Sequence, residues 1–189
     1  MKSIKNNVDN TYIINKSKFI CYLYKVDNID EIDNYLNEIK NKYKDATHHC
    51  YAYIIDNIKR FSDDNEPGGT AGMPILNVLE NNDLNHILCI DVRYFGGIKL
   101  GAGGLVRAYT KSVTEALNNT EIKELINGYR LTIEFDYDDT KKIDNLLKNC
   151  NIINKEFNDK VKYIIELSED EYELIKDNLN IINIENTII

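Results

Sequence analysis

Glycine is distributed unevenly along this chain of 189 residues. Eight of its nine glycines lie between Gly68 and Gly104, and both prolines, Pro67 and Pro74, lie in or beside the same window. Glycine allows tight and left-handed backbone that other residues avoid. We therefore expect a regular scaffold whose irregular backbone is concentrated in the middle of the sequence, where binding and catalytic sites usually lie.

Strand patterns surround this window. Apolar residues alternate in residues 17–26 and 48–56, which predicts two strands, and residues 57–62 are expected to return as the hairpin partner of the second. Residues 86–95 are almost entirely apolar, which is typical of a strand buried on both faces. We therefore expect this strand at the centre of a sheet.

Three helices are predicted between and after these strands. Apolar residues spaced by three or four predict the first helix, which begins at Asn28 or Asp30 and ends near Tyr43. Thr70 is expected to cap the second helix. The third helix covers residues 105–119. Its inward face is expected to consist of Val106, Tyr109, Val113 and Leu117.

Gly128 is predicted to end a first domain, which gives domains 1–128 and 129–189. The second domain shows the order strand, helix, strand, strand, helix, strand, which is the βαββαβ order of a ferredoxin-like fold. Asp138 or Asp139 is expected to cap its first helix. The predicted fold class is therefore α+β, with two domains in succession.

Acidic side chains outnumber basic ones by 31 to 23, which gives a net charge of −8. Residues 1–128 carry 15 basic and 17 acidic side chains (net −2), whereas residues 129–189 carry 8 and 14 (net −6). So acidic a chain is not a general binder of polyanions. Any nucleic-acid site must be a local basic patch on a body that repels phosphate.

Cellular location is indicated by the cysteines and by the start of the chain. The four cysteines are far apart and form no CxxC pair, and the first ten residues lack the apolar stretch of a secretory signal. No run approaches 18 consecutive apolar residues. We therefore expect a cytoplasmic protein with reduced thiols and no membrane span.

Residues 93–111 form the first candidate site. A strand ends there, a glycine-rich loop follows and a helix begins, which leaves unpaired backbone N–H groups that suit a phosphate. The segment has four basic residues and no acidic one, although glycines that only permit tight turns would give the same pattern. The predicted anion-binding or nucleic-acid-binding residues are Arg93, Lys99, Gly101, Gly103, Gly104, Arg107, Lys111 and, from the preceding loop, Thr70.

Residues 62–74 form the second candidate site. Asp63, Asp64 and Glu66 offer oxygen ligands to Mg²⁺ or Ca²⁺, but bonds from an aspartate to backbone N–H groups of the loop are the favoured interpretation. The N–H groups of residues 69–72 are then expected to be free for a second anion.

His48 and Cys50 precede this loop and share one face of their predicted strand. A zinc site or a cysteine nucleophile activated by histidine is conceivable there, but packing and hydrogen bonding are favoured, since the sequence supplies no third partner. We therefore predict no metal, no cofactor and no catalytic residue.

Three segments together resemble the YigZ/IMPACT family: HHCYAY (48–53), SDDNEPGGTAGMPIL (62–76) and VRYFGGIKLGAGGLVRAYTKSV (92–113). The resemblance covers most of residues 10–118. Where the family commonly has DDGEP, this chain has Asn65 in place of glycine. Asparagine tolerates a positive φ, so the turn is expected to survive.

The resemblance implies a first domain with the fold of the second domain of small-subunit ribosomal protein five, as in elongation factor G. It implies a tail similar to a C-terminal domain of that factor. Eukaryotic relatives modulate the kinase that restrains translation initiation, with the help of an RWD domain. Only a few residues precede the first predicted strand, so that domain and that activity are not expected here. The likeness to translation proteins is an analogy of fold.

Three functions are compatible with these observations. The leading hypothesis is a non-enzymatic protein that binds RNA or the ribosome through the basic glycine-rich loop. The second is an enzyme that acts on a small phosphorylated or anionic ligand held between the two glycine-rich loops, which requires the loops to converge. The third is an adaptor whose acidic tail domain binds a basic partner or a second copy of the chain, which a large exposed apolar patch on residues 129–189 would support.

Overall fold

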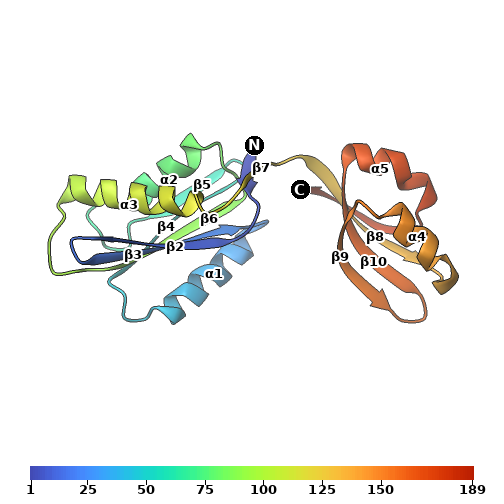
Figure 1. The fold of residues 1–189 in the computed structure, drawn as a ribbon, viewed down its shortest axis with the longest axis horizontal. Helices are drawn as coiled ribbons and strands as arrows, with labels where there is room; N and C mark the ends of the chain where they lie inside the picture. Colours follow the sequence, from blue (N-terminus) through green and yellow to red (C-terminus); the bar gives the residue numbers. More distant parts are fainter. The chain divides into compact units, whose positions relative to one another are not determined.

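The computed structural model describes all 189 residues, and the chain divides into two compact units, Met1–Glu124 and Leu125–Ile189 (Figure 1). Gly128, the predicted boundary, lies inside strand β8 (Asn127–Phe135), where a Cβ would come within 2.4 Å of the Leu167 carbonyl oxygen. This glycine therefore serves close strand packing and not a linker. None of the helices has the length and apolar character that crossing a membrane requires.

The first unit is built on a five-stranded antiparallel sheet in the order β2-β3-β6-β4-β5. Its strands are β2 (Val8–Ile14), β3 (Ser17–Lys25), β4 (His48–Ile55), β5 (Ile58–Ser62) and β6 (Ile87–Tyr94). The apolar strand β6 occupies the centre, as predicted, and its side chains are buried on both faces. Two short strands, β1 (Lys2–Ile4) and β7 (Ile122–Glu124), pair with each other outside this sheet.

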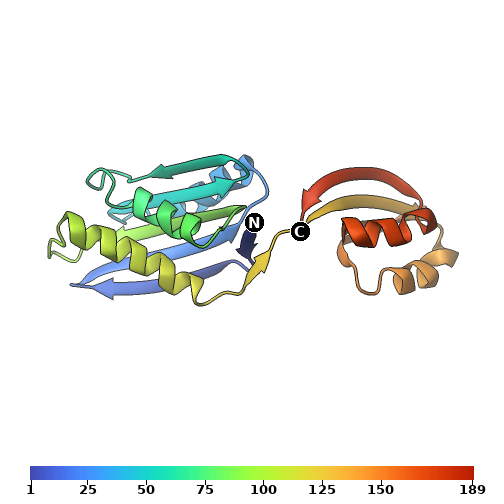
Figure 2. The ribbon, with the colours of Figure 1, turned by 90° about the horizontal axis from the view of Figure 1, so that it is seen from above.

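Helices cover both faces of the sheet. Helix α1 (Ile29–Lys42) lies on one face, and helices α2 (Gly72–Asn81) and α3 (Ala102–Leu117) lie on the other (Figure 1). Seen from above, α2 and α3 lie side by side across the strands (Figure 2). Each face has its own core because alternate side chains of β6 point to opposite sides. Cys89 packs toward α2 and α3, whereas Ile90 packs toward α1.

Helix α3 differs from the prediction in its start and in its buried face. It begins at Ala102, and Val106, predicted to face inward, is 38% exposed. The prediction for Val106 is wrong because Leu105 and Ala108 lie nearer the centre of the buried stripe. The stripe consists of Leu105, Ala108, Tyr109, Ser112, Val113, Ala116 and Leu117.

The second unit has the predicted ferredoxin-like fold. Its elements are β8 (Asn127–Phe135), α4 (Thr140–Leu146), β9 (Asn151–Phe157), β10 (Val161–Ser168), α5 (Glu169–Ile175) and β11 (Ile181–Ile188). The antiparallel sheet has the order β11-β8-β10-β9. Asp139 stands at the start of α4 but makes no capping hydrogen bond, because a 3₁₀ turn over Tyr137–Asp139 precedes the helix. The predicted cap is therefore wrong.

Candidate functional site

The second glycine-rich loop connects β6 to α3 and is held by close backbone packing. A Cβ on Gly96 would lie 2.0 Å from the carbonyl carbon of Lys16, so only glycine fits against the β2–β3 turn. Gly101 has φ +71°, which permits the turn into α3. No side chain caps this helix, and its first backbone bond runs from Leu105 N to Gly101 O. The start of α3 therefore offers N–H groups to a ligand.

The first glycine-rich loop is organised by one carboxylate. Asp63 Oδ2 accepts the N–H of Gly69 at 2.8 Å, and Oδ1 accepts those of Ala71 at 3.0 Å and Gly72 at 2.8 Å. The prediction that an aspartate bonds this loop is confirmed. The predicted second anion site on residues 69–72 is wrong because Asp63 already occupies these donors.

Thr70 does not cap helix α2. Its hydroxyl donates to the Pro67 carbonyl at 2.6 Å, and the residue is buried. The helix begins after Ala71, and the carboxylate of Asp63 takes the place of a local cap. The predicted cap is wrong, and Thr70 is placed where it lines neither of the loop cavities described below.

The tip of the first loop uses left-handed backbone. Asp64 has φ +41° and Asn65 has φ +66°, so asparagine keeps the turn that we expected it to keep. Asp64 Oδ2 accepts the N–H of His49 at 2.6 Å, and the Asp64 carbonyl is 2.7 Å from His48 Nδ1. A carbonyl can only accept, so His48 Nδ1 carries the proton and Nε2 is left to face Glu66.

Both glycine-rich loops line one cavity of about 420 Å³. Its walls combine apolar and charged residues: Thr47, His48, Glu66, Pro67, Arg93, Phe95, Lys99, Leu100, Gly101, Ala102 and Leu105. The loops therefore converge, which is the arrangement that the small-anion hypothesis requires.

A buried ion pair forms one wall of this cavity. Arg93 Nη1 donates to Glu66 Oε1, and the two side chains are only 5% and 3% exposed. Tyr109 OH donates to the same oxygen at 2.8 Å, while His48 Nε2 lies 3.8 Å from Glu66 Oε2. Arg93 is buried, whereas Lys99, Arg107 and Lys111 are exposed, so the prediction of Arg93 as an exposed phosphate ligand is wrong. Its charge is neutralised by Glu66.

Two of the remaining predicted basic residues, Arg107 and Lys111, lie on the outer side of α3. Arg107 and Lys111 are exposed and share one helix face, as their spacing predicts. They line a second depression of about 400 Å³, whose other residues are Tyr12, Ile14, Asn15, Leu100, Gly104 and Ala108. Lys99 and Gly101 line the first cavity instead, and Leu100 borders both. The glycine-rich segment therefore separates two hollows.

Cys50 is buried beneath the first loop. Its thiol donates to the Asp63 carbonyl at 3.1 Å and lies 3.3 Å from Tyr109 OH. Burial raises the pKa of the Cys50 thiol far above its usual range, which disfavours the thiolate that a nucleophile needs. No three histidine, cysteine, aspartate or glutamate side chains are grouped so as to hold a metal ion.

Sequence reasoning missed a buried carboxyl group at the centre of the sheet. Asp91 on β6 is fully buried, and neither of its oxygens has a hydrogen-bond partner within normal geometry. Burial raises its pKa to about 8, and the Ser112 hydroxyl of α3 lowers it in part. The available signal was an acidic residue in a strand whose only other charged residue is Arg93.

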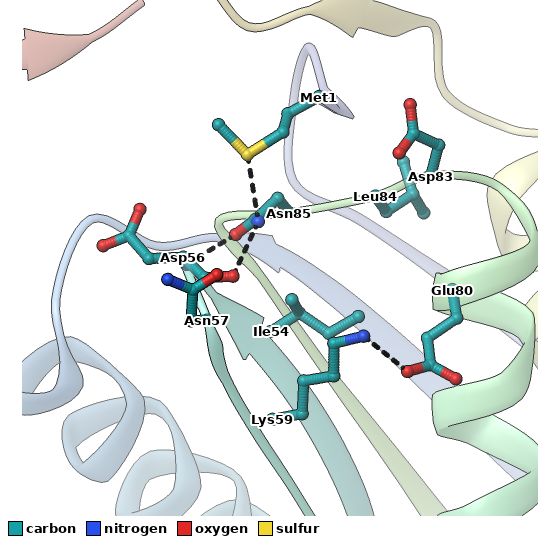
Figure 3. A pocket seen from close by; sticks show the side chains of 9 residues that line it. All are labelled: Met1, Ile54, Asp56, Asn57, Lys59, Glu80, Asp83, Leu84 and Asn85. Carbon is teal, nitrogen blue, oxygen red and sulfur yellow. Dashed lines mark hydrogen bonds and ion pairs between the residues drawn. The ribbon is translucent and has the colours of Figure 1, made fainter.

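A third hollow, of about 290 Å³, is polar (Figure 3). Asn85 Oδ1 accepts the N–H groups of Asp56 and His86 at 2.8 and 2.7 Å, and Nδ2 donates to the Asp56 carbonyl at 3.0 Å. Lys59 and Glu80 form an ion pair of 2.8 Å across the same hollow. These polar groups are hydrogen-bonded or paired with one another. The bonds of Asn85 hold the β4–β5 turn against the start of β6.

The second unit exposes several large hydrophobic side chains. They are Ile126, Tyr137, Ile153, Phe157, Leu174, Ile182 and Ile184. They are spread over β9, α5, β11, the turn before α4 and the segment before β8, and the adaptor and oligomer hypotheses stay predictions.

Comparison with known proteins agrees with this architecture. The model of the Impact N-terminal domain matches residues 15–117, and a domain of unknown function, DUF1949, matches residues 133–180. A solved structure described as a hypothetical protein is 30% identical, with a TM-score of 0.63 and 97% of each chain covered.

Two bacterial relatives are similar over most of their length. The IMPACT family member YvyE of Bacillus subtilis is 39% identical over 174 residues, which cover 89% of this chain and 80% of YvyE. The IMPACT family member YigZ of Escherichia coli is 37% identical over 153 residues, covering 76% and 74%. With a family model over more than half of its length and relatives of this similarity, the chain belongs to the YigZ/IMPACT family.

Proposed function

We propose that this protein takes part in translation by binding RNA, free or within the ribosome, through phosphate contacts on helix α3. The observation that carries the proposal is the exposed pair Arg107 and Lys111, one turn apart on α3 beside the half-buried ring of Tyr12. Lys99 extends this basic surface along the preceding loop. The family resemblance supports the link to translation.

The charge distribution favours the first unit as the RNA-binding part. Residues 1–124 carry 15 basic and 17 acidic side chains, a net charge of −2, whereas residues 125–189 carry 8 and 14, a net of −6. Arg107 has no ion-pair partner, while Lys111 shares Glu115 at 3.4 Å. Three phosphate contacts by Lys99, Arg107 and Lys111 give a salt slope of about −2 on single-stranded RNA.

The test is the binding of a labelled single-stranded RNA across a salt series. The double variant Arg107→Ala/Lys111→Ala is expected to weaken binding and to reduce the salt slope by about 1.4, at about 0.7 per lost phosphate contact. The matched control is Lys141→Ala/Lys142→Ala, which removes the same charge from the exposed face of α4 in the second unit.

Two outcomes contradict the proposal. One is the absence of RNA binding at low salt. The other is an equal loss of binding in the α3 and α4 variants, because net charge alone would then explain the affinity.

A further inference from the structure

We propose that the cavity between the two glycine-rich loops binds a small organic anion, with its carboxylate or phosphate group at the start of α3 and an apolar body against Phe95 and Leu105. Apart from Lys99, which the RNA proposal also uses, the site is distinct from the outer face of α3 assigned to RNA. The proposal of this anion site does not depend on whether the protein binds RNA.

The start of α3 supplies the anionic end of the site. Ala102 and Gly101 line the cavity, and the helix is long, with 16 residues and no capping side chain. Its first N–H groups carry the positive end of the helix dipole. Lys99, which lies three residues before Ala102 and also lines the cavity, adds a full charge without an ion-pair partner. Helix α2 differs because Asp63 already fills its N-terminus.

A second, independent observation comes from the opposite wall. Arg93 lines the cavity, its side chain is 95% buried, and its Nε–H has no hydrogen-bond partner. Glu66 holds Nη1, and Ser17 Oγ lies 3.4 Å from Nη2, so the guanidinium is fixed in place while this donor stays unused. Buried donors are normally satisfied, and Arg93 lines the cavity, so an acceptor atom of a ligand held against Arg93 would supply the bond that the protein does not.

His48 and Glu66 add polar groups to the same wall. His48 Nδ1 is committed to the Asp64 carbonyl, so Nε2 remains for the cavity. Glu66 Oε1 accepts from Arg93 and Tyr109, whereas Oε2 accepts no hydrogen bond and lies 3.8 Å from His48 Nε2. A ligand with a hydrogen-bond donor beside its anionic group could donate to Glu66 Oε2 or His48 Nε2 while its anionic group binds the start of α3.

The rest of the lining is apolar, which sets the class of ligand. Phe95 is 46% exposed, and Pro67, Leu100 and Leu105 complete the wall. The Arg93 guanidinium carbon lies 5.7 Å from the centre of the Phe95 ring. Small-molecule sites combine such apolar walls with a few placed polar groups. A hydrated RNA backbone has no apolar body to bury here, which favours a compact organic anion.

Phenyl phosphate is the probe of choice because it joins an anion to an apolar ring. Titrated into the ¹⁵N-labelled protein at constant ionic strength, it is expected to shift the backbone amides of Lys99, Ala102 and Gly103. Inorganic phosphate is expected to bind more weakly, and phenol is expected to leave these amides unmoved. Benzoate, titrated in the same way, shows whether the site also takes a carboxylate.

Ala102→Pro is the sharpest variant. Proline is tolerated in the first turn of a helix, and it removes one N–H donor. Loss of one charge-assisted hydrogen bond is expected to weaken phenyl phosphate about tenfold. Phe95→Ala is the second variant, and it is expected to weaken phenyl phosphate severalfold without affecting inorganic phosphate. The control Arg107→Ala/Lys111→Ala should bind phenyl phosphate as the native protein does.

Three results would overturn the proposal. The first is that neither phenyl phosphate nor benzoate shifts the amides at the start of α3. The second is that phenol shifts them as strongly, which would leave the anion without a role. The third is that the Arg107→Ala/Lys111→Ala control loses as much affinity as Ala102→Pro. Retained phenyl phosphate binding with lost RNA binding in that control would show that the two sites are separate.

Discussion

At the scale of single residues, Asp91 is the most unusual group in the first unit. It lies on the central strand, faces α3, and opposes Cys21 on one neighbouring strand and Cys50 on the other. Neither oxygen is hydrogen-bonded, and burial raises its pKa to about 8. The folded state therefore holds a proton that the unfolded chain releases near pH 4. Asp91 makes folding depend on pH in a range where ordinary carboxyl groups do not titrate.

The direction of this dependence follows from proton binding. The folded pKa lies above the unfolded one, so the contribution to stability is complete below about pH 4 and is lost as the pH rises toward 8. At 1.36 kcal/mol per pH unit, the loss from pH 5 to pH 8 is at most about 4 kcal/mol. Asp91→Asn cannot lose a proton. Its free energy of unfolding relative to the native protein is therefore expected to be higher at pH 8 than at pH 5.

Urea unfolding of both proteins at the two pH values measures this difference. Any fixed cost of burying the amide cancels in the comparison. Asp83→Asn, a change at an exposed carboxyl group, is the control and should show no such pH dependence. An equal effect of Asp91→Asn at both pH values would contradict the raised pKa.

The candidate site shows what single residues reveal from sequence alone. Arg107 and Lys111 share an exposed helix face, as predicted, because their spacing on a helix determines their face. The cap of helix α2 was predicted wrongly. The carboxylate of Asp63, which lies outside the first turn of the helix, accepts N–H groups at the start of α2, where we expected Thr70 to act as the cap. The pairing of Arg93 with Glu66 depends on tertiary contact between strand β6 and the first glycine-rich loop, and no local pattern expresses it.

At the scale of elements, the loop before α3 is positioned by its contact with the β2–β3 turn. Gly96 packs so closely on Lys16 that a Cβ would meet the backbone at 2.0 Å, whereas a Cβ on Gly103 would meet only the flexible end of Arg107, at 3.5 Å. Gly96 N also donates to Ser17 Oγ at 3.2 Å. The contact anchors the start of the loop that leads to α3.

Gly96→Ala is therefore expected to lower the free energy of unfolding by about 3 kcal/mol or more, since backbone must move. Gly103→Ala is the control in the same segment, and it is expected to raise stability by about 0.5–1 kcal/mol because alanine favours the helix. Urea denaturation measures both. A Gly96→Ala protein as stable as the native one would contradict the close contact.

Most elements could be predicted because their side chains are buried on a regular period. The strands at 17–26, 48–56 and 86–95 and the helices between them follow this rule. Strand β2 was missed because it is an edge strand whose residue types do not alternate: Asn10 lies on its half-buried side and Ile13 on its exposed side. Strands β1 and β7 were missed because three residues carry no periodicity, and each exists only through its partner.

At the scale of the whole molecule, the two units have separate cores. The first unit is filled from both faces of its sheet, and the second is filled around Leu131, Tyr163 and Ile165. The fragments 1–124 and 125–189 are therefore each expected to fold alone. Circular dichroism and thermal unfolding of the fragments test this. An unfolded 1–124 fragment would show that its core depends on the second unit.

The same fragments locate the RNA-binding part. The fragment 1–124 keeps Arg107 and Lys111 and loses a net charge of −6, so it is expected to bind RNA at least as tightly as the full chain. The fragment 125–189 is expected not to bind. The two-domain α+β organisation was predictable because the second unit repeats a known order of elements, whereas the unit boundary depends on contacts that sequence does not display.

The pairing of β1 with β7 has a topological consequence for the first unit. Lys2 lies opposite Glu124 and Ile4 lies opposite Ile122, so the beginning and the end of the unit are neighbours. The two ends of the unit are therefore close enough in space to be joined by a short linker. Joining residue 124 to residue 1 and opening the chain at the Asp56–Asn57 turn would give a circular permutant with the same strand order. We therefore expect the permutant to form the same five-stranded sheet as the native unit.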